Sequence, residues 1–69
     1  MPMPEAERKR YNSDCRKVDR LKEQRRAAKN KIERADLTAQ LRDAYIKFDE
    51  KWNGYTPTEE MLARWLAIN

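Results

Sequence analysis

The feature that most constrains this chain is a stretch from Glu5 to Asn53 that contains no Gly and no Pro. Ala, Arg, Lys, Glu, Gln and Leu dominate the stretch, and all of these residues are good helix formers. Because Gly and Pro are the strongest signals for turns and helix ends, their absence here predicts long helices. The fold class that we predict is all-α.

The spacing of apolar residues divides this stretch into two stripes. A thin stripe, in which Arg25 stands where an apolar residue should fall, consists of Val18, Leu21, Ala28, Ile32, Ala35 and Ala39. A heavier stripe consists of Leu37, Leu41, Ala44, Tyr45, Phe48 and Trp52. The two stripes are out of phase, although residues on one helix face recur every three or four positions. We therefore predict a break near Ala35-Asp36, and one continuous helix with a drifting seam remains the alternative.

This break defines the first two predicted elements. Residues 1–12 form a flexible N-terminal arm, and a basic helix follows over residues 13–34. Asn12 or Ser13 would cap the start of this helix, because side chains of this type accept hydrogen bonds from free backbone amides. A second helix covers residues 36–52, with Asp36 as its N-cap.

A turn with the sequence Gly-Tyr-Thr-Pro-Thr, residues 54–58, separates the second helix from a third. Gly54 can adopt a positive φ and end the second helix. Thr56 as N-cap, Pro57 as the first helical residue and Glu59 as capping-box partner would start the third helix, over 57–68. Its apolar residues are Met61, Leu62, Trp65, Leu66 and Ile68. Residues 35–69 are thus predicted to form a two-helix hairpin behind the basic helix.

Charge and aromatic residues lie in opposite halves of the 69 residues. Residues 1–34 hold twelve basic and six acidic side chains, whereas residues 35–69 hold four basic and six acidic ones. Both Trp and the only Phe lie in the second half. We expect only the last two helices to bury a substantial face against each other. So small a core predicts a marginal monomer that self-associates or folds onto a partner.

Composition excludes several classes of function. A single cysteine, Cys15, can form no internal disulfide and no zinc-ligand set, and we expect a reduced, inert thiol. With no His, no glycine-rich phosphate loop and no catalytic pair, the chain is expected not to be an enzyme and to hold no cofactor or metal. No apolar run is long enough to span a membrane or to serve as a signal peptide, which predicts a cytoplasmic protein, or one of the host cytoplasm if viral.

The cationic residues of the first half are the candidate nucleic-acid contacts, because Lys and Arg side chains that neutralise phosphates give sequence-independent, salt-sensitive binding. These residues are Arg8, Lys9, Arg10, Arg16, Lys17, Arg20, Lys22, Arg25, Arg26, Lys29 and Lys31. Few carboxylates stand at a favourable helical spacing from them. We therefore favour a polyanionic or acidic partner over a merely solvated helix face.

Aromatic and apolar residues supply a second set of candidates. Trp52 lies on the heavy stripe and is predicted to be core. Trp65 could fill the core or serve as an exposed anchor, and with Met61 and Ile68 it forms the candidate protein interface. Tyr11 is the tyrosine in a basic setting, where it could stack on a base.

Two segments resemble known families. The run from Asn53 to Thr58, with Leu62-Ala63 and the closing residues 66–69, resembles the first two helices of the LexA-type winged helix-turn-helix. This resemblance covers about residues 35–69 and implies a helical hairpin scaffold. Ala67 stands where that family has Gly, and the recognition helix is missing, which argues against base readout. Residues 24–29 are similar to the arginine-rich RNA-binding helices of lambdoid antitermination N proteins.

Together these features predict a small basic regulatory protein of phage or mobile-element type. It would bind nucleic acid, DNA or RNA, or a nucleoprotein complex, without sequence-specific base readout. One alternative is a protein-binding inhibitor or adaptor, either anti-CRISPR-like or polymerase-binding. Another is a structural helix of a larger particle. A homodimer or a larger protein partner is compatible with each, and no membrane partner is expected.

Overall fold

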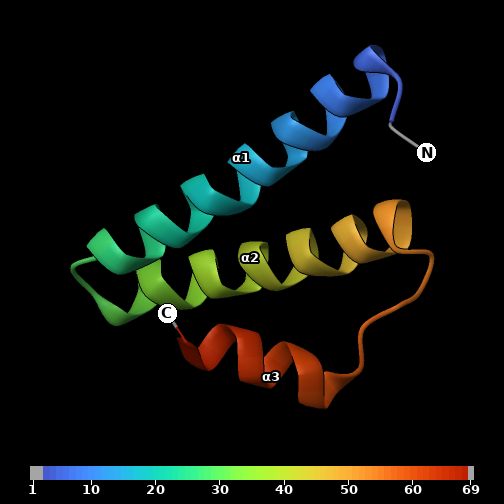
Figure 1. The fold of residues 1–69 in the computed structure, drawn as a ribbon. Coiled ribbons are helices and arrows are strands. Elements are labelled where there is room, and N and C mark those ends of the chain that lie inside the picture. The colour runs from blue at the N-terminus through green and yellow to red at the C-terminus, as the bar shows by residue number, and fades with distance from the viewer. Residues whose placement is uncertain (1–2, 69) are drawn as a thin grey trace.

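The computed structural model describes residues 3–68, and this part of the chain is all-α, as predicted. Its helices are α1 (Glu5–Ala27), α2 (Lys31–Trp52) and α3 (Glu59–Ile68). The first two form an antiparallel hairpin, and α3 lies along one side of that pair (Figure 1). No helix among the described residues is both long and apolar enough to cross a membrane.

The break between the first two helices lies at residues 28–30, so the predicted break at Ala35-Asp36 is wrong. Asn30 is the N-cap of α2, and its side-chain oxygen accepts a hydrogen bond from the Glu33 backbone N–H at 2.7 Å. Asn at the N-cap with Glu three residues later is a helix-start pattern that needs neither Gly nor Pro. The cap reverses the chain, and Ala28 before it is extended.

This earlier break changes the environment of the residues that follow it. Ile32, which the thin stripe placed on an apolar face, is 85% exposed. Asp36, the predicted N-cap, lies inside α2, where its carboxylate accepts a hydrogen bond from Gln40. The heavy stripe is unaffected, and Leu37 and Leu41 on it are buried.

The first helix begins at Glu5 rather than near residue 13, so residues 5–12 of the predicted arm are helical and residues 1–2 lie outside the described part. Pro4 occupies the N-cap position without a side-chain hydrogen bond, and Asn12 and Ser13 lie inside α1. Glu5 and Glu7 stand in the first turn, where negative charge interacts favourably with the helix dipole.

Packing of α1 against α2 forms a major part of the fold, which corrects the expectation that only the last two helices share a substantial face. The Tyr11 ring lies 5.4 Å from the Phe48 ring and 5.3 Å from the Trp52 ring, measured between centroids. The prediction failed because it assigned Tyr11 to the arm. The α1 face that is half-buried comprises Tyr11, Asp14, Cys15, Val18, Leu21, Lys22 and Arg25.

A single carboxylate ties the middle of α1 to the end of α2. One oxygen of Asp14 accepts hydrogen bonds from Lys51 Nζ at 3.0 Å and from Trp52 Nε1 at 2.9 Å. These hydrogen bonds, from Lys51 first and Trp52 second, lower the pKa of Asp14 below its ordinary value of 3.8. Trp52 is half-buried as part of this cluster.

The turn into α3 follows the prediction at Gly54 and departs from it at the cap. Gly54 has a φ of 73°, the left-handed conformation that ends a helix. The N-cap of α3 is Thr58 and not Thr56, because the Thr58 hydroxyl accepts a hydrogen bond from Met61 N–H at 3.2 Å. Thr56 instead donates to Glu50. The helix therefore begins two residues later than expected.

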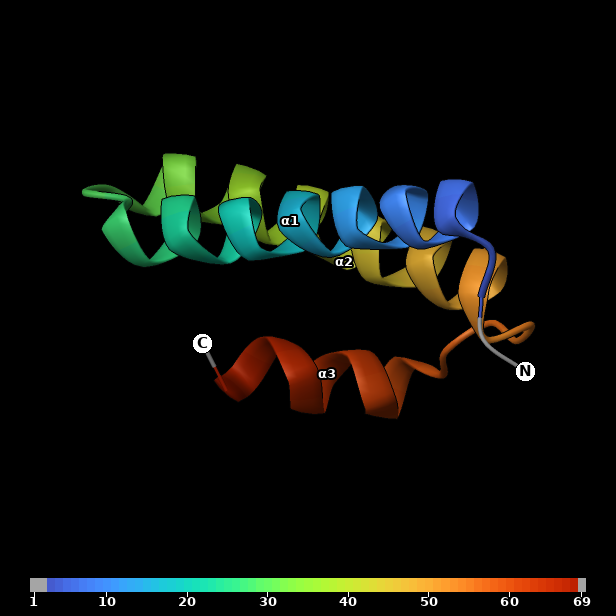
Figure 2. The same ribbon diagram turned by 45° about the horizontal axis from the view of Figure 1, so that its top comes forward.

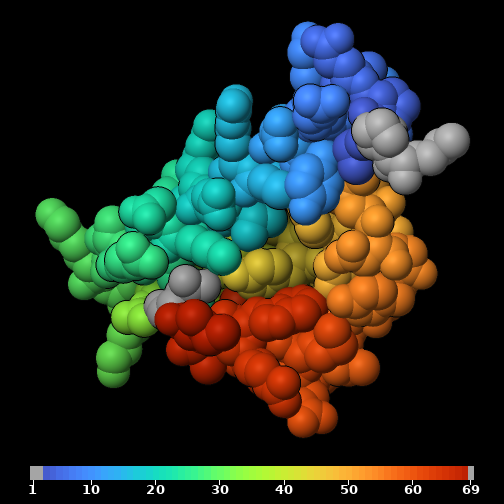
Figure 3. Space-filling view, viewed as in Figure 1, coloured from blue at the N-terminus to red at the C-terminus, as the bar shows by residue number. Residues whose placement is uncertain are grey.

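The third helix rests on the core through Leu62, which is buried together with Leu37 and Leu41. At its N-terminal end, Glu59 forms an ion pair with Arg42 of α2. The space-filling view shows α3 covering one flank of the hairpin, with the α1 and α2 side chains filling the space above it (Figure 3).

Replacing Asn30 with Ala should lower the free energy of unfolding by about 1 kcal/mol, because the substitution removes an N-cap. Urea denaturation followed by circular dichroism measures this change. Asn12→Ala is the matched control, since Asn12 lies inside α1 and Ala is the better helix former there. Equal destabilisation by both substitutions would contradict the helix boundary at Asn30.

Asp14→Asn should reduce stability by about 1 kcal/mol at pH 7, because hydrogen bonds to a charged group are stronger than those to a neutral one. The folded-state pKa of Asp14 is lowered, so its contribution is present above about pH 4 and is lost as the pH falls through that pKa. Unfolding measured from pH 2 to 7 should therefore give curves that converge at the acid end. Asp19→Asn, an exposed carboxylate on the same helix, should show no such convergence.

Candidate nucleic-acid interface

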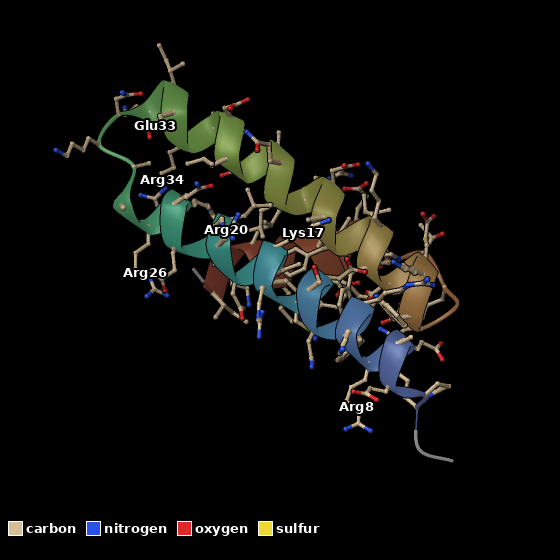
Figure 4. All side chains as sticks on the ribbon, turned by 90° about the horizontal axis from the view of Figure 1, so that it is seen from above. Arg8, Lys17, Arg20, Arg26, Glu33 and Arg34 are labelled. Carbon is tan, nitrogen blue, oxygen red and sulfur yellow. The ribbon has the colours of Figure 1, made fainter. Side chains whose placement is uncertain are left out.

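Most of the predicted cationic contacts lie on the solvent side of α1. The half-buried face of α1 is turned to α2 and α3. Most of the cationic residues lie at the remaining, exposed positions of this helix. Arg8 and Arg26 extend from α1 on the side away from α2 (Figure 4). The exposed members of the predicted set are Arg8, Lys9, Arg10, Arg16, Lys17, Arg20, Arg26, Lys29 and Lys31.

Five of these residues form what we call the outer stripe: Lys9, Arg10, Arg16, Lys17 and Arg20. Lys9, Arg16 and Arg20 are spaced by seven and four residues, so they share one side of the helix, with Arg10 and Lys17 beside them. The stripe extends for about 16 Å at 1.5 Å per residue. Of the two carboxylates between Lys9 and Arg20, Asp14 turns inward to α2, whereas Asp19 is exposed beside the stripe and forms no ion pair with it.

The cations of the outer stripe are largely free of intramolecular partners. Among the described residues, Arg10, Arg16, Lys17 and Arg20 take part in no ion pair or side-chain hydrogen bond. Lys9 lies 3.9 Å from Glu5, and both side chains are highly exposed. An exposed pair of this kind contributes little, so Lys9 stays available to an external anion.

Two members of the predicted set, Lys22 and Arg25, face inward. Lys22 is half-buried, and its Nζ lies 5.7 Å from the centre of the Tyr45 ring, a cation–π arrangement. Arg25 is half-buried too, and its Nη1 donates a hydrogen bond to the Leu66 carbonyl of α3 at 2.8 Å. Both residues lie on the same half-buried face of α1 as Val18, which explains why they are not exposed.

The contact from Arg25 to Leu66 holds the C-terminal end of α3. The last carbonyls of a helix have no partner within the helix and carry partial negative charge, which a guanidinium complements. The Nε of Arg25 is buried with no hydrogen-bond partner within the described structure. Its position in the thin apolar stripe, at the point where an apolar residue should fall, was the sequence signal for an inward cation.

The three residues of the predicted protein interface are not equally exposed. The Trp65 ring packs against Tyr45, with the centroids 5.5 Å apart, and Met61 is half-buried. Ile68 is 77% exposed. Trp65 and Ile68 line a cavity of about 340 Å³ between the three helices. Trp65 is thus half-buried against Tyr45, and Ile68 is the most exposed of the three.

Tyr11 is not free to stack on a base, because its ring lies against Phe48 and Trp52. The buried polar residue that sequence reasoning did not single out is Asp49, which is 7% exposed. One of its oxygens accepts a hydrogen bond from Asn53 at 2.7 Å. Burial raises the pKa of the Tyr55 phenol, and the neighbouring Asp49 carboxylate raises it further.

Arg25→Ala should lower the free energy of unfolding by about 2 kcal/mol, because it removes a hydrogen bond from a charged donor to a helix end. Urea denaturation and the far-ultraviolet helix signal measure the loss. Arg26→Ala is the control, since Arg26 is exposed and pairs only with Glu23 at 3.4 Å. If the two substitutions had the same effect, Arg25 would not be the residue that holds α3.

Comparison of the chain with models of protein families, with curated proteins and with solved structures finds no significant match.

Proposed function

We propose that this protein binds nucleic acid through the outer stripe of α1 and recognises the phosphate backbone rather than the base sequence. The observation that carries the proposal is a row of five exposed Lys and Arg side chains on one side of a helix, four of which have no carboxylate partner among the described residues. Such a row raises the local concentration of anions and releases condensed counterions when phosphates bind.

The dimensions of the stripe suit a polyanion better than an isolated anion. It extends for about 16 Å, and double-stranded DNA carries one charge per about 1.7 Å of its axis. Roughly ten phosphates therefore lie within its length, and five cations can each find a separate one. Because α1 is packed against α2, the backbone that carries the cations is already ordered, so binding costs no further backbone entropy there.

Phosphate contacts position a protein on nucleic acid but carry no sequence information. The stripe is made of Lys and Arg, and Tyr11, Tyr45 and Trp65 are half-buried elsewhere in the molecule. Tyr11, Tyr45 and Trp65 are all held in ring–ring contacts and so do not form a stacking platform. These features support backbone recognition in preference to readout of base edges or stacking on bases.

Binding of a 20-base-pair duplex of mixed sequence should weaken steeply with salt. Five phosphate contacts predict a slope of log K against log salt of about −4.5, which corresponds to a loss of about 500-fold between 50 and 200 mM. Fluorescence anisotropy titrations at several salt concentrations measure the slope. Affinity that does not change with salt would contradict the proposal.

The double substitution Arg16→Ala/Arg20→Ala should reduce the steepness of the slope by about 1.8, because each lost contact accounts for about 0.9. Arg64→Glu is a charge-matched control, since it also lowers the net charge by two but stands on α3, where Arg64 pairs with Glu60. The control should leave the slope nearly unchanged. Equal losses in both variants would show that net charge acts, and not the outer stripe.

A further inference from the structure

The accessible surface of the chain is larger than is usual for a folded monomer of its mass. The accessible surface is 5513 Å² for 8.3 kDa. Monomeric proteins of this mass expose about 4,600 Å². The excess is comparable to the area of about 800 Å² that each partner buries in a standard protein interface. It reflects a flat shape of 43 × 23 × 16 Å, in which α3 covers one side of the hairpin and leaves the other bare (Figure 2).

A groove runs between α1 and α2 on the side that α3 does not cover. One hollow of about 480 Å³ has an apolar floor that includes Val18, Leu21 and Phe48. A second hollow, of about 490 Å³, lies toward the connection between the helices and includes Ala27 and Leu37. Gln40 lines both hollows, so they meet at the middle of α2, and neither is lined by a residue of α3.

The α2 border of this groove is divided by charge. Its N-terminal half carries Glu33 and Asp36, which line the second hollow. Its C-terminal half carries Lys47 and Lys51, which line the first hollow together with Asp43. Lys47 forms an ion pair with Asp43 and Lys51 forms one with Asp14, and the α2 residues that line the first hollow keep a net positive charge. The Glu33–Asp36 and Lys47–Lys51 pairs recur at helical spacing on either side of Gln40. A surface that is acidic at one end and basic at the other is complementary to a copy of itself turned end for end, which is the geometry of a two-fold interface.

We infer that a second copy of this chain covers the groove, with its α2 antiparallel to the α2 beneath it. A two-fold axis crossing α2 near its middle places Lys47 opposite Asp36 of the second copy, and Lys51 opposite Glu33. Each pairing occurs twice by symmetry. The apolar floors of the two grooves then lie in the same interface, flanked by the polar and charged side chains of the two α2 helices.

This dimer does not rest on the proposed function. Both α3 helices stay on the outside, and Lys9, Arg16 and Arg20, on the side of α1 opposite its packed face, remain exposed in both copies. Lys17, which lines the first hollow, is the member of the outer stripe that lies at the edge of this interface. The dimer would also bury further apolar surface. In the monomer, Leu37, Leu41 and Leu62 are the buried aliphatic residues among those described, so the core is small.

The test uses two single charge reversals, Lys47→Glu and Asp36→Lys. Each places like charges opposite each other twice across the interface, so each should raise the dimer dissociation constant at least tenfold. Sedimentation equilibrium of the full chain should give a dimer of 8.3 kDa subunits for the wild type and mainly monomer for each variant at the same concentration. An equimolar mixture of the two variants should form a heterodimer, because every opposed pair is then attractive.

Two controls separate this inference from a loss of folding. The helix signal of both variants should match that of the wild type, since both side chains are exposed. Arg64→Glu, a charge reversal on α3, should leave the dimer intact. A monomeric wild type, dimers in both single variants, or a mixture that stays monomeric would each overturn the inference.

Discussion

The hydrogen bond from the Glu33 backbone amide to the Asn30 side chain determines how this chain is arranged. Without a break, residues 5–52 would form one long helix, and the face that α1 now packs against α2 would have no partner in the hairpin. The cap ends that run at a defined residue and turns it back on itself. As a result, residues far apart in the sequence, such as Asp14 and Trp52, come within 2.9 Å of each other.

The hairpin sorts the cations of α1 by helix face. Lys22 and Arg25 stand on the inward face. Lys22 lies over the Tyr45 ring, and Arg25 donates a hydrogen bond to the C-terminal end of α3. Lys9, Arg16 and Arg20 stand on the opposite face, and little in the molecule neutralises them. The same residue types therefore stabilise the fold on one side of a helix and remain available to a partner on the other. Position on the helix, and not residue type, decides between these roles.

The sequence predicted the fold class, the heavy stripe and the turn at Gly54, because periodicity and a left-handed glycine are local signals. It did not locate the break between the first two helices. The shift between the two stripes indicated a break near Asp36, whereas the observed break depends on the side chain of a single residue, Asn30. Because Tyr11 was assigned to a flexible arm, its contacts with Phe48 and Trp52, which join α1 to α2, were not predicted. The outer stripe was contained in the predicted set. The position of Arg25 in the thin apolar stripe signalled an inward cation, but its partner, the Leu66 carbonyl, could not be predicted without knowing where α3 ends.

The attachment of α3 has a consequence for how the molecule fluctuates. This ten-residue helix is held by Leu62, by the Tyr45–Trp65 contact and by one cation at each end, Arg42 and Arg25. A segment with so few buried contacts opens locally at a lower free energy than the elements it rests on. Its amide hydrogens would exchange with solvent while the hairpin stays closed, and each opening would briefly expose the buried Leu62 side chain to water.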